Sequence, residues 1–298
     1  MTLIEMMKAY IKDHNGIKQS DTIRGELGHL RAIEKCLDNL RIVTTDDLTY
    51  SSYNDIVKYF KTNTNNKNAS VNKIIAFLKA VLRYHGFNEH SFLLTKKLKD
   101  DTSHVKPIYE DDLIDIFRYV KSINKNENSI VYRAVIELLY ATGCRIGELL
   151  DIKIKNIDLR HRIILVDKTK TKKERYVFYS INQDDLIKKL ISKNPKREYL
   201  FWNFLKHRRL SKNDVKLFNR KMKENLGLRQ LNSRQFRKTM ATDLAKVTGG
   251  DLKMIQTILG HSDIKMTQVY VDYTTDQAQK SYMRVYDQLI LNKELLIK

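Results

Sequence analysis

Six basic or phenolic side chains from residue 145 onward combine residue types that could act on a phosphate group. Each stands beside a predicted turn or helix end, and in chain order they are Arg145, Lys170, Arg234, Arg237, His261 and Tyr270. Cationic groups stabilise phosphate charge, and a tyrosine oxygen can attack phosphorus. The sequence has no acidic cluster for two-metal catalysis, no Walker loop and no HExxH zinc motif. The set therefore indicates metal-free phosphate chemistry with a side-chain nucleophile.

The segment ATGCRIGELL places Arg145 directly after a Thr-Gly turn and close to the start of the next predicted helix. The free N–H groups at a helix start favour an anion, and a guanidinium can form two parallel hydrogen bonds to phosphate oxygens. The alternative is a surface arginine that pairs with Glu148. Arg145 taken alone favours this alternative.

The segment RIILVDKTKTKKERYVFYS changes from helical spacing to a β-branched run, a polar turn and a second strand. This pattern predicts a β-hairpin with a basic tip. Such a tip could lie along a DNA groove, and a lysine in it could protonate a leaving oxygen; the candidates are Lys168, Lys170 and Lys172. The alternative is a solvated run of charge.

The segment LNSRQFRKTMATDLA carries Arg234 and Arg237 three residues apart, which places them on one face of a predicted helix. Two guanidinium groups on one face repel each other unless an anion lies between them, and phosphate is the obvious candidate. The alternative is a pair of exposed basic residues.

The segment LGHSDIKMTQVYVDY predicts the end of one helix, a Gly-His turn and a second helix. His261 lies in the turn, and Tyr270 and Tyr273 lie in the second helix. Taken alone, a histidine in such a turn is more often a structural hydrogen-bonding group, and the tyrosines more often pack. Next to the basic residues above, one tyrosine becomes a candidate nucleophile.

The elements that must position these residues are mostly helical. Residues 1–98 predict a four-helix domain, residues 99–108 (KDDTSHVKP and its flank) a linker, and residues 109–298 a second domain with a helical tail. The four helices are expected over residues 2–13, 21–40, 49–61 and 70–85. The fold class is therefore mainly α with a small β-hairpin or sheet (α+β).

The composition favours a polyanionic partner. Lys and Arg number 55 against 35 Asp and Glu in 298 residues, a formal net charge of +20. Nucleic acid fits better than a membrane, because no stretch approaches ~18 uninterrupted apolar residues. The first residues predict an amphipathic helix and lack a signal-peptide pattern. Cys36 and Cys144 have no metal-ligand or disulfide spacing, which suits a reducing cytoplasm.

The four segments in their order resemble the motifs of the tyrosine recombinase family, the phage-integrase and Xer-like enzymes, over roughly residues 109–288. ATGCRIGELL is similar to the first arginine box, KTKTKKER to the hairpin lysine segment and LNSRQFRKTMATDL to the His-x-x-Arg box. LGHSDIKMTQVY is similar to the final box, with the usual His-to-Tyr spacing (270 − 261 = 9). The N-terminal four-helix block is similar in size to the family's core-binding domain.

The resemblance implies a role for each residue. Tyr270 attacks the scissile phosphate and becomes linked to the 3′ phosphate, and Lys170 protonates the departing 5′ oxygen. Arg145 and Arg237 hold the non-bridging oxygens, His261 donates a hydrogen bond to the phosphate, and Glu148 braces the arginines. No cofactor and no metal are expected, since the phosphotyrosine ester conserves the bond energy for religation.

One residue departs from the family pattern. The family usually has histidine three residues before its second arginine, and this position is Arg234 here. Arginine can donate hydrogen bonds to phosphate but cannot act as a general base. We therefore expect Arg234 to be a third phosphate clamp, while another group takes the tyrosine proton.

The resemblance also implies a partner and an assembly. The two domains would clamp double-stranded DNA at a specific recombination site, and a tetramer would act on two duplexes through a Holliday junction. The apolar stripe of the C-terminal tail, from Tyr282 to Leu291, is expected to dock on a neighbouring subunit, with packing on its own domain as the alternative. The biological role has three alternatives: resolution of chromosome dimers, integration or excision of an element, and inversion of a segment. The compact size favours simple Xer-like recombination. Two rival functions are a type IB topoisomerase and a catalytically weak DNA-binding relative.

Overall fold

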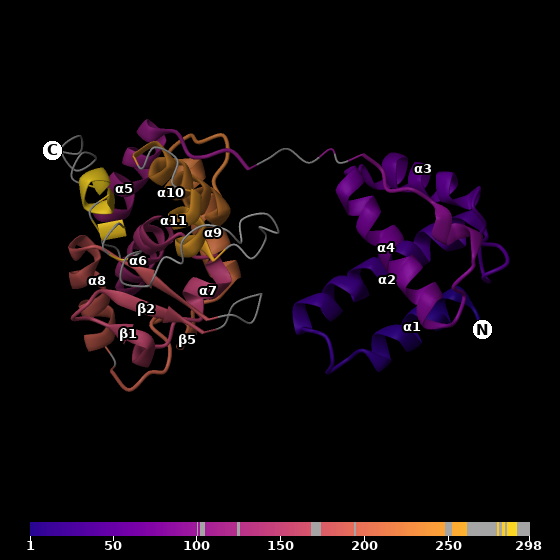
Figure 1. The fold of residues 1–298 in the computed structure, drawn as a ribbon, viewed down its shortest axis with the longest axis horizontal. Coiled ribbons are helices and arrows are strands. Elements are labelled where there is room, and N and C mark those ends of the chain that lie inside the picture. The colour runs from indigo at the N-terminus through magenta and orange to yellow at the C-terminus, as the bar shows by residue number, and fades with distance from the viewer. Residues whose placement is uncertain are drawn as a thin grey trace. The chain divides into compact units, whose positions relative to one another are not determined.

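The chain forms two compact units, residues Met1–His104 and Val105–Lys298. The computed structural model describes residues 1–99, 101, 105–123, 126–167, 174–193, 195–247, 252–260, 279, 282–283 and 285–290. The boundary between the units falls inside the segment 99–108, where the sequence places a linker. The first unit runs from indigo to magenta in Figure 1, and each unit has its own hydrophobic core.

The first unit contains four α-helices and a short 3-10 helix. They are α1 (Leu3–Asp13), α2 (Ser20–Leu40), α3 (Ser52–Thr64), α4 (Asn68–Tyr84) and η1 (Ser91–Leu94). Thr2 and Glu5 form a capping box at the start of α1. The apolar stripe expected on the fourth helix is buried, in agreement with its helical spacing: Val71, Ile74, Ile75, Leu78, Val81 and Leu82.

The fourth helix begins two residues earlier than the sequence predicts, and the cause is a distant side chain. The backbone N–H groups of Asn68 and Ala69 donate to the carboxylate of Asp101, at 2.8 and 3.4 Å. A carboxylate accepting these otherwise unpaired donors caps the helix start. Because Asp101 lies 33 residues beyond Asn68 along the chain, local sequence could not place this boundary.

The second unit combines helices with two small antiparallel sheets. The helices are α5 (Glu110–Ser122), α6 (Glu127–Thr142), α7 (Ile146–Leu150), α8 (Ile181–Ser192), α9 (Lys212–Asn225), α10 (Ser233–Val247) and α11 (Leu252–Leu259), with the 3-10 helix η2 (Ile154–Asn156). One sheet has the order β1 (Ile157–Asp158), β2 (Ile163–Val166), β3 (Arg175–Phe178), and the other pairs β4 (Trp202–Asn203) with β5 (Arg208–Arg209). The expected hairpin strands are β2 and β3, so the mainly α fold with small sheets is confirmed.

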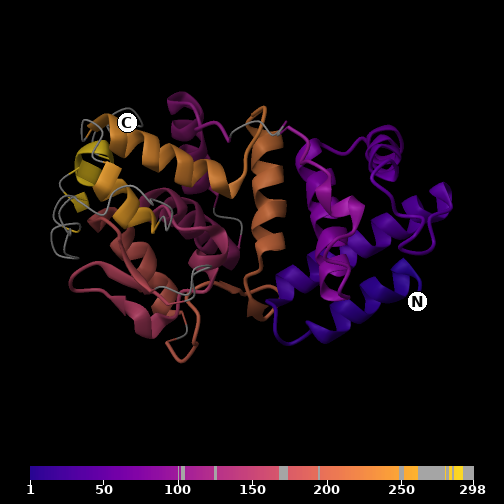
Figure 2. The same cartoon turned by 45° about the vertical axis from the view of Figure 1, so that its right-hand side comes forward.

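Helix α6 is the centre of the second unit. It contacts α5, α8 and α10, which can be followed around it in Figures 1 and 2. Almost all of its residues from Val131 to Thr142 are buried, since a helix surrounded on several sides must be apolar around most of its circumference. It ends at Gly143, whose φ of +60° is the left-handed conformation that glycine adopts readily.

The C-terminal aromatic residues pack on the chain's own domain. Tyr282 and Tyr286 are buried and stack with ring centroids 5.1 Å apart, and the Tyr282 hydroxyl donates to the carbonyl of Ala141. Val285 and Ile290 belong to the same core. For these four residues the structure shows the alternative to docking on a neighbour, because their side chains belong to the core of the second unit. Leu291 lies outside the described residues. Within the part of the chain that the structure describes, no helix is long and apolar enough to cross a membrane.

Candidate phosphate-binding site

Arg145 lies at the N-cap of α7 and is tied to Glu148 in the first turn of that helix. The Arg145 backbone N–H donates to Glu148 Oε2 at 2.9 Å, and its Nη1 donates to Glu148 Oε1 at 2.8 Å. The Glu148 side chain is 4% exposed, whereas that of Arg145 is 40% exposed. The pairing weighed as the alternative for Arg145 is therefore present, but it anchors an arginine whose side chain stays accessible.

Arg237 is buried and joins the ends of two other helices. Its Nη1 donates to the carbonyl of Gly143, which follows α6, and its Nη2 donates to the carbonyl of Leu259, the last residue of α11, each at 2.8 Å. Helix ends leave such carbonyls without a partner in the helix. Arg237 therefore fixes the C-terminal ends of α6 and α11 to α10.

Arg175 is a third arginine in the cluster, and its sequence position predicted no role for it. It is the first residue of β3, its side chain is 10% exposed, and its Nη2 donates to Glu148 Oε2 at 2.8 Å. The signal that could have found it is the strand period. Arg175 and Val177 point to one face of the strand and the exposed Tyr176 to the other, so Arg175 faces the interior.

The electrostatics of this arginine cluster, defined as Arg145, Arg175, Arg237 and Glu148, favour an anion. Burial, together with the positive charges of Arg145 and Arg175, lowers the pKa of Arg237 to about 10. Burial alone would raise the pKa of Glu148, but the bonds from Arg175 and Arg145 outweigh this effect and lower it. One carboxylate among three guanidinium groups leaves positive charge uncompensated, which a bound phosphate would neutralise.

The thiol of Cys144 lies inside this arrangement. It is fully buried, and burial raises its pKa. Its sulfur is 4.0 Å from Nη2 of Arg175. A neutral buried thiol acts as a small packing group.

Gly143 is required both by its backbone conformation and by its neighbours. A Cβ at this position would lie 2.7 Å from Leu259 Cδ2 and 3.1 Å from Met240 Sδ, and both side chains are buried. We expect Gly143→Ala to lower the free energy of unfolding by about 3 kcal/mol, of which the positive φ supplies about 1 kcal/mol. Thermal unfolding of the full chain measures the loss.

Gly227→Ala is the matched control for this substitution. Gly227 has a φ of +63°, but a Cβ there would meet nothing within 4 Å. Its loss should therefore stay near about 1 kcal/mol, the cost of the positive φ alone. Equal losses in the two variants would show that packing against Leu259 and Met240 is not tight.

Arg234 is not brought into the arginine cluster. It lies on α10 one turn before Arg237, but Arg234 is exposed whereas Arg237 is buried. Its backbone N–H donates to Asn232 Oδ1 at 3.0 Å, which is a contact within the turn before the helix. The expectation that the two arginines share one face is thus met only loosely, and Arg234 points to solvent at the start of the helix.

Three predicted site residues lie outside the described residues: Lys170, His261 and Tyr270, together with the rival Tyr273. Described residues directly beside two of these segments nevertheless lie at the arginine cluster. A Cβ on Gly260, directly before His261, would lie 2.5 Å from Arg175 Cδ. Arg175 itself follows the hairpin segment 168–173 after Glu174 alone. The end of the hairpin segment KTKTKKER and the start of the segment LGHSDIKMTQVY therefore meet at Arg175.

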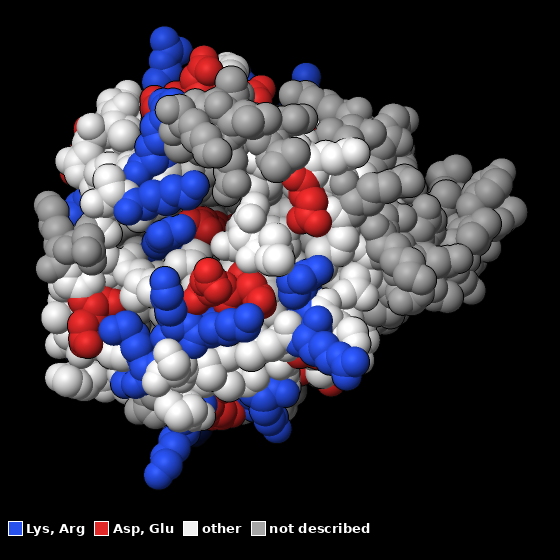
Figure 3. Space-filling model, turned by 90° about the vertical axis from the view of Figure 1, so that its left-hand side faces the viewer, with Lys and Arg blue, Asp and Glu red and all other residues white. Residues whose placement is uncertain are grey.

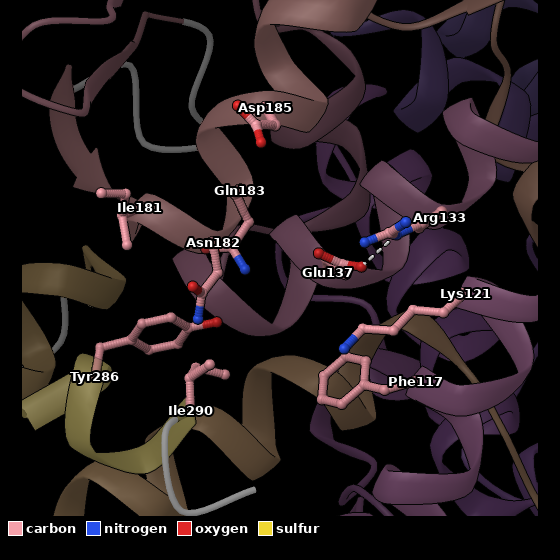
Figure 4. Close-up of a pocket in the computed structure, with 10 residues that line it drawn as sticks. All are labelled: Phe117, Lys121, Arg133, Glu137, Ile181, Asn182, Gln183, Asp185, Tyr286 and Ile290. Atoms are coloured by element: carbon pink, nitrogen blue, oxygen red, sulfur yellow. Dashed lines mark hydrogen bonds and ion pairs between the residues drawn. The ribbon is translucent and has the colours of Figure 1, made fainter. Parts of the chain in front are cut away.

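A separate pocket of about 280 Å³ lies away from these residues (Figure 4). It is bounded by α5, α6, α8 and the C-terminal helical residues, and Arg133 Nε donates to Glu137 Oε1 at 2.7 Å in its wall. None of the predicted site residues lines it.

On the face of the molecule drawn in Figure 3, basic side chains are interspersed with acidic ones. Among the described residues, no group of three or more His, Cys, Asp or Glu side chains could hold a metal ion.

Comparison with known proteins gives the family. Residues 106–277 match the phage integrase family. A probable integrase/recombinase of Acholeplasma phage L2 is 35% identical over 262 residues, which is 87% of this chain and 90% of the relative. The tyrosine recombinase XerC of Bacillus pumilus is 30% identical over 275 residues, 86% of this chain and 88% of the relative.

Two solved structures share the fold. A Tn1549 transposon integrase in complex with a circular intermediate DNA has a TM-score of 0.74 at 19% identity, covering 94% of this chain and 98% of that one. A lambda integrase dimer bound to a COC′ core site has a TM-score of 0.71 at 18% identity, covering 92% and 100%. With its ordered arginine boxes and the family match over more than half of its length, the chain belongs to the phage integrase family and is a tyrosine site-specific recombinase.

Proposed function

We propose that this recombinase cuts and rejoins double-stranded DNA with Tyr270 as the nucleophile and with Arg145 and Arg237 holding the scissile phosphate. The observation that carries the proposal is the arginine cluster. Arg145 is anchored yet accessible, Arg237 is buried between two helix ends, and the positive charge they share is only partly compensated by Glu148. Phosphate is an anion that fits such an arrangement.

The proposed reaction conserves the number of phosphate ester bonds. The Tyr270 oxygen attacks phosphorus and gives up its proton to water or His261, since Arg234 cannot act as a base. The bond from phosphorus to the 5′ oxygen breaks, and Lys170 gives the leaving oxygen a proton. The product is a 3′-phosphotyrosyl intermediate and a free 5′ hydroxyl. Attack by a 5′ hydroxyl reverses these steps, so religation needs no external energy source. The arginines stabilise the charge that develops on the non-bridging oxygens, and His261 adds a hydrogen bond.

The partner in this proposal is a specific DNA site bound by several copies of the chain. The net charge of +20 favours a polyanion, and phosphate contacts should make binding steeply salt-dependent. The two units would clamp the duplex, and a tetramer would act on two sites. Solved relatives include a lambda integrase tetramer bound to a Holliday junction.

The free thiols of Cys36 and Cys144 suit a reducing cytoplasm. Integration of an element and Xer-like resolution are both compatible with this chemistry.

A suicide substrate tests the proposal. The binding site is first selected from random duplex DNA, and a nick is then placed beside it so that the released fragment diffuses away after cleavage. A protein–DNA adduct that survives denaturation supports the proposal. Relaxation of plasmids of random sequence by the monomer would indicate the topoisomerase alternative, and tight binding without any adduct would indicate a catalytically weak DNA-binding relative.

We propose that Arg234 acts as an additional phosphate clamp in place of the family's histidine. Arg234→His should lower the rate of adduct formation by about tenfold, the effect of weakening one charge-assisted hydrogen bond. Because Arg234 is exposed, the melting temperature should not change. Lys238→His, at another exposed position of α10, is the matched control and should cleave at the wild-type rate. A faster Arg234→His variant would instead show that the arginine is a handicap.

A further inference from the structure

We propose that Arg175 is a positioning residue of the recombinase site, which holds Glu148 in the orientation that presents Arg145 to the phosphate. This inference rests on the proposed function of Arg145. It assigns a role to a residue that lies in the hairpin strand and that no step of the proposed reaction uses.

The first observation is the way in which Glu148 is shared. Its Oε1 accepts from Nη1 of Arg145, and its Oε2 accepts from both the backbone of Arg145 and Nη2 of Arg175. Because only 4% of the Glu148 side chain is exposed, its carboxylate oxygens depend on hydrogen bonds from the protein and not from water. Arg175 therefore supplies one of the three hydrogen bonds that orient this carboxylate.

The second observation is the division of charge between the two arginines. A carboxylate that pairs with one guanidinium neutralises it, whereas a carboxylate shared by two leaves part of the charge on each. Arg175 also contributes to lowering the pKa of Arg237, after burial and Arg145, so its charge acts on that guanidinium as well. Arg145 consequently keeps positive charge for a phosphate while remaining fixed by Glu148.

The third observation is that Arg175 is itself held firmly in place. Its stem packs against Gly260, where any Cβ would lie 2.5 Å from Cδ and 2.9 Å from Nε. Its side chain is 10% exposed. A guanidinium confined on these sides cannot easily turn away from Glu148, so it can act as a fixed point for the pair at the start of α7.

The test measures cleavage and DNA binding separately in the full chain. Arg175→Gln should slow adduct formation at saturating DNA by about 10²-fold, comparable with the loss of one preorganised donor, while the Kd for the site rises less than about threefold. Arg175→Lys keeps the charge and should recover about tenfold of the lost rate. Arg118→Gln, which removes a guanidinium paired with Asp115 on the exposed surface of α5, should cleave at the wild-type rate.

A double variant tells positioning through Glu148 from a general loss of structure. If Arg175 acts through Glu148, Arg175→Gln combined with Glu148→Gln should be no slower than the slower single variant. Multiplied losses, or wild-type cleavage by Arg175→Gln, would overturn the inference. The Arg175→Lys variant and melting temperatures keep the comparison decisive if Arg175→Gln unfolds.

A substrate with sulfur in place of the leaving 5′ oxygen provides a second criterion, because a thiolate departs without a proton donor. This substrate should not restore the rate of Arg175→Gln, since the proposed defect lies at Arg145. Restoration would show that Arg175 places the hairpin lysine instead and would overturn the inference. A wild-type chain that forms no adduct would overturn the proposed function and this inference together, whereas unaffected Arg175 variants would overturn the inference alone.

Discussion

Tyr270→Phe is expected to abolish the covalent complex with DNA, whereas Tyr273→Phe should leave it at the wild-type level. The substitution removes only the oxygen that we propose attacks phosphorus, and loss of a nucleophile lowers the rate by more than about 10⁴-fold in enzymes with a side-chain nucleophile. A free tyrosine has a pKa of ~10, so little phenolate exists at neutral pH. In the proposed site, the uncompensated positive charge of Arg145, Arg175 and Arg237 would favour the phenolate and the developing charge on phosphate together.

Three measurements make this comparison strict. Adduct formation on the suicide substrate reports the chemistry, and the Kd for the intact site should be unchanged in both variants, because neither loses a charge. Mass spectrometry of the adduct formed by the wild-type chain should place the nucleotide on the peptide that contains Tyr270. An adduct that survives in Tyr270→Phe and disappears in Tyr273→Phe would assign the nucleophile to Tyr273 and displace the family spacing as the guide.

The parts of the site that sequence could predict are those with a local signature. Arg145 follows a Thr-Gly turn and begins a helix, and Arg237 lies one turn into another helix; the structure places both in a single cluster. The β-branched run and the basic turn predicted the strands β2 and β3. In each case the residues that decide the local structure lie within a few positions of one another.

The parts that sequence could not predict depend on contacts between distant segments. Arg175 belongs to the site only because β3 lies beside the start of α7, 27 residues away along the chain from Glu148. The strand period places Arg175 on the same face as Val177, but it does not show which distant segment that face meets. The start of α4 likewise depends on Asp101, and the C-terminal tyrosines pack on their own domain because α6 offers a carbonyl and space for their rings.

Arg237→Lys should lower the rate of adduct formation by about 10³-fold, although the charge is conserved. The guanidinium donates to two carbonyls at once, those of Gly143 and Leu259, and still has further N–H groups for a phosphate. A lysine ammonium is a single point and cannot span both carbonyls while it faces the substrate. The loss of a preorganised charged donor accounts for about 10²–10³-fold, and the displaced ends of α6 and α11 add to it.

The control for this variant is Arg209→Lys, which separates the loss of a fork to carbonyls from the loss of phosphate binding. Arg209 donates through Nε and Nη2 to the carbonyl of Leu150 and lies over the ring of Tyr199. Both substitutions should lower the free energy of unfolding, by about 1–3 kcal/mol, because each leaves a carbonyl less well paired.

Only Arg237→Lys should lose cleavage at temperatures where both variants remain folded.

The environment of Arg237 also predicts a pH effect, since burial together with Arg145 and Arg175 lowers the pKa of a cation at this position. A lysine starts from a pKa of only ~10.4, so its charged fraction should rise as the pH falls, and the residual cleavage of Arg237→Lys should rise with it. Equal cleavage by the two variants at all pH values would mean that Arg237 serves to join helices and does not hold the phosphate.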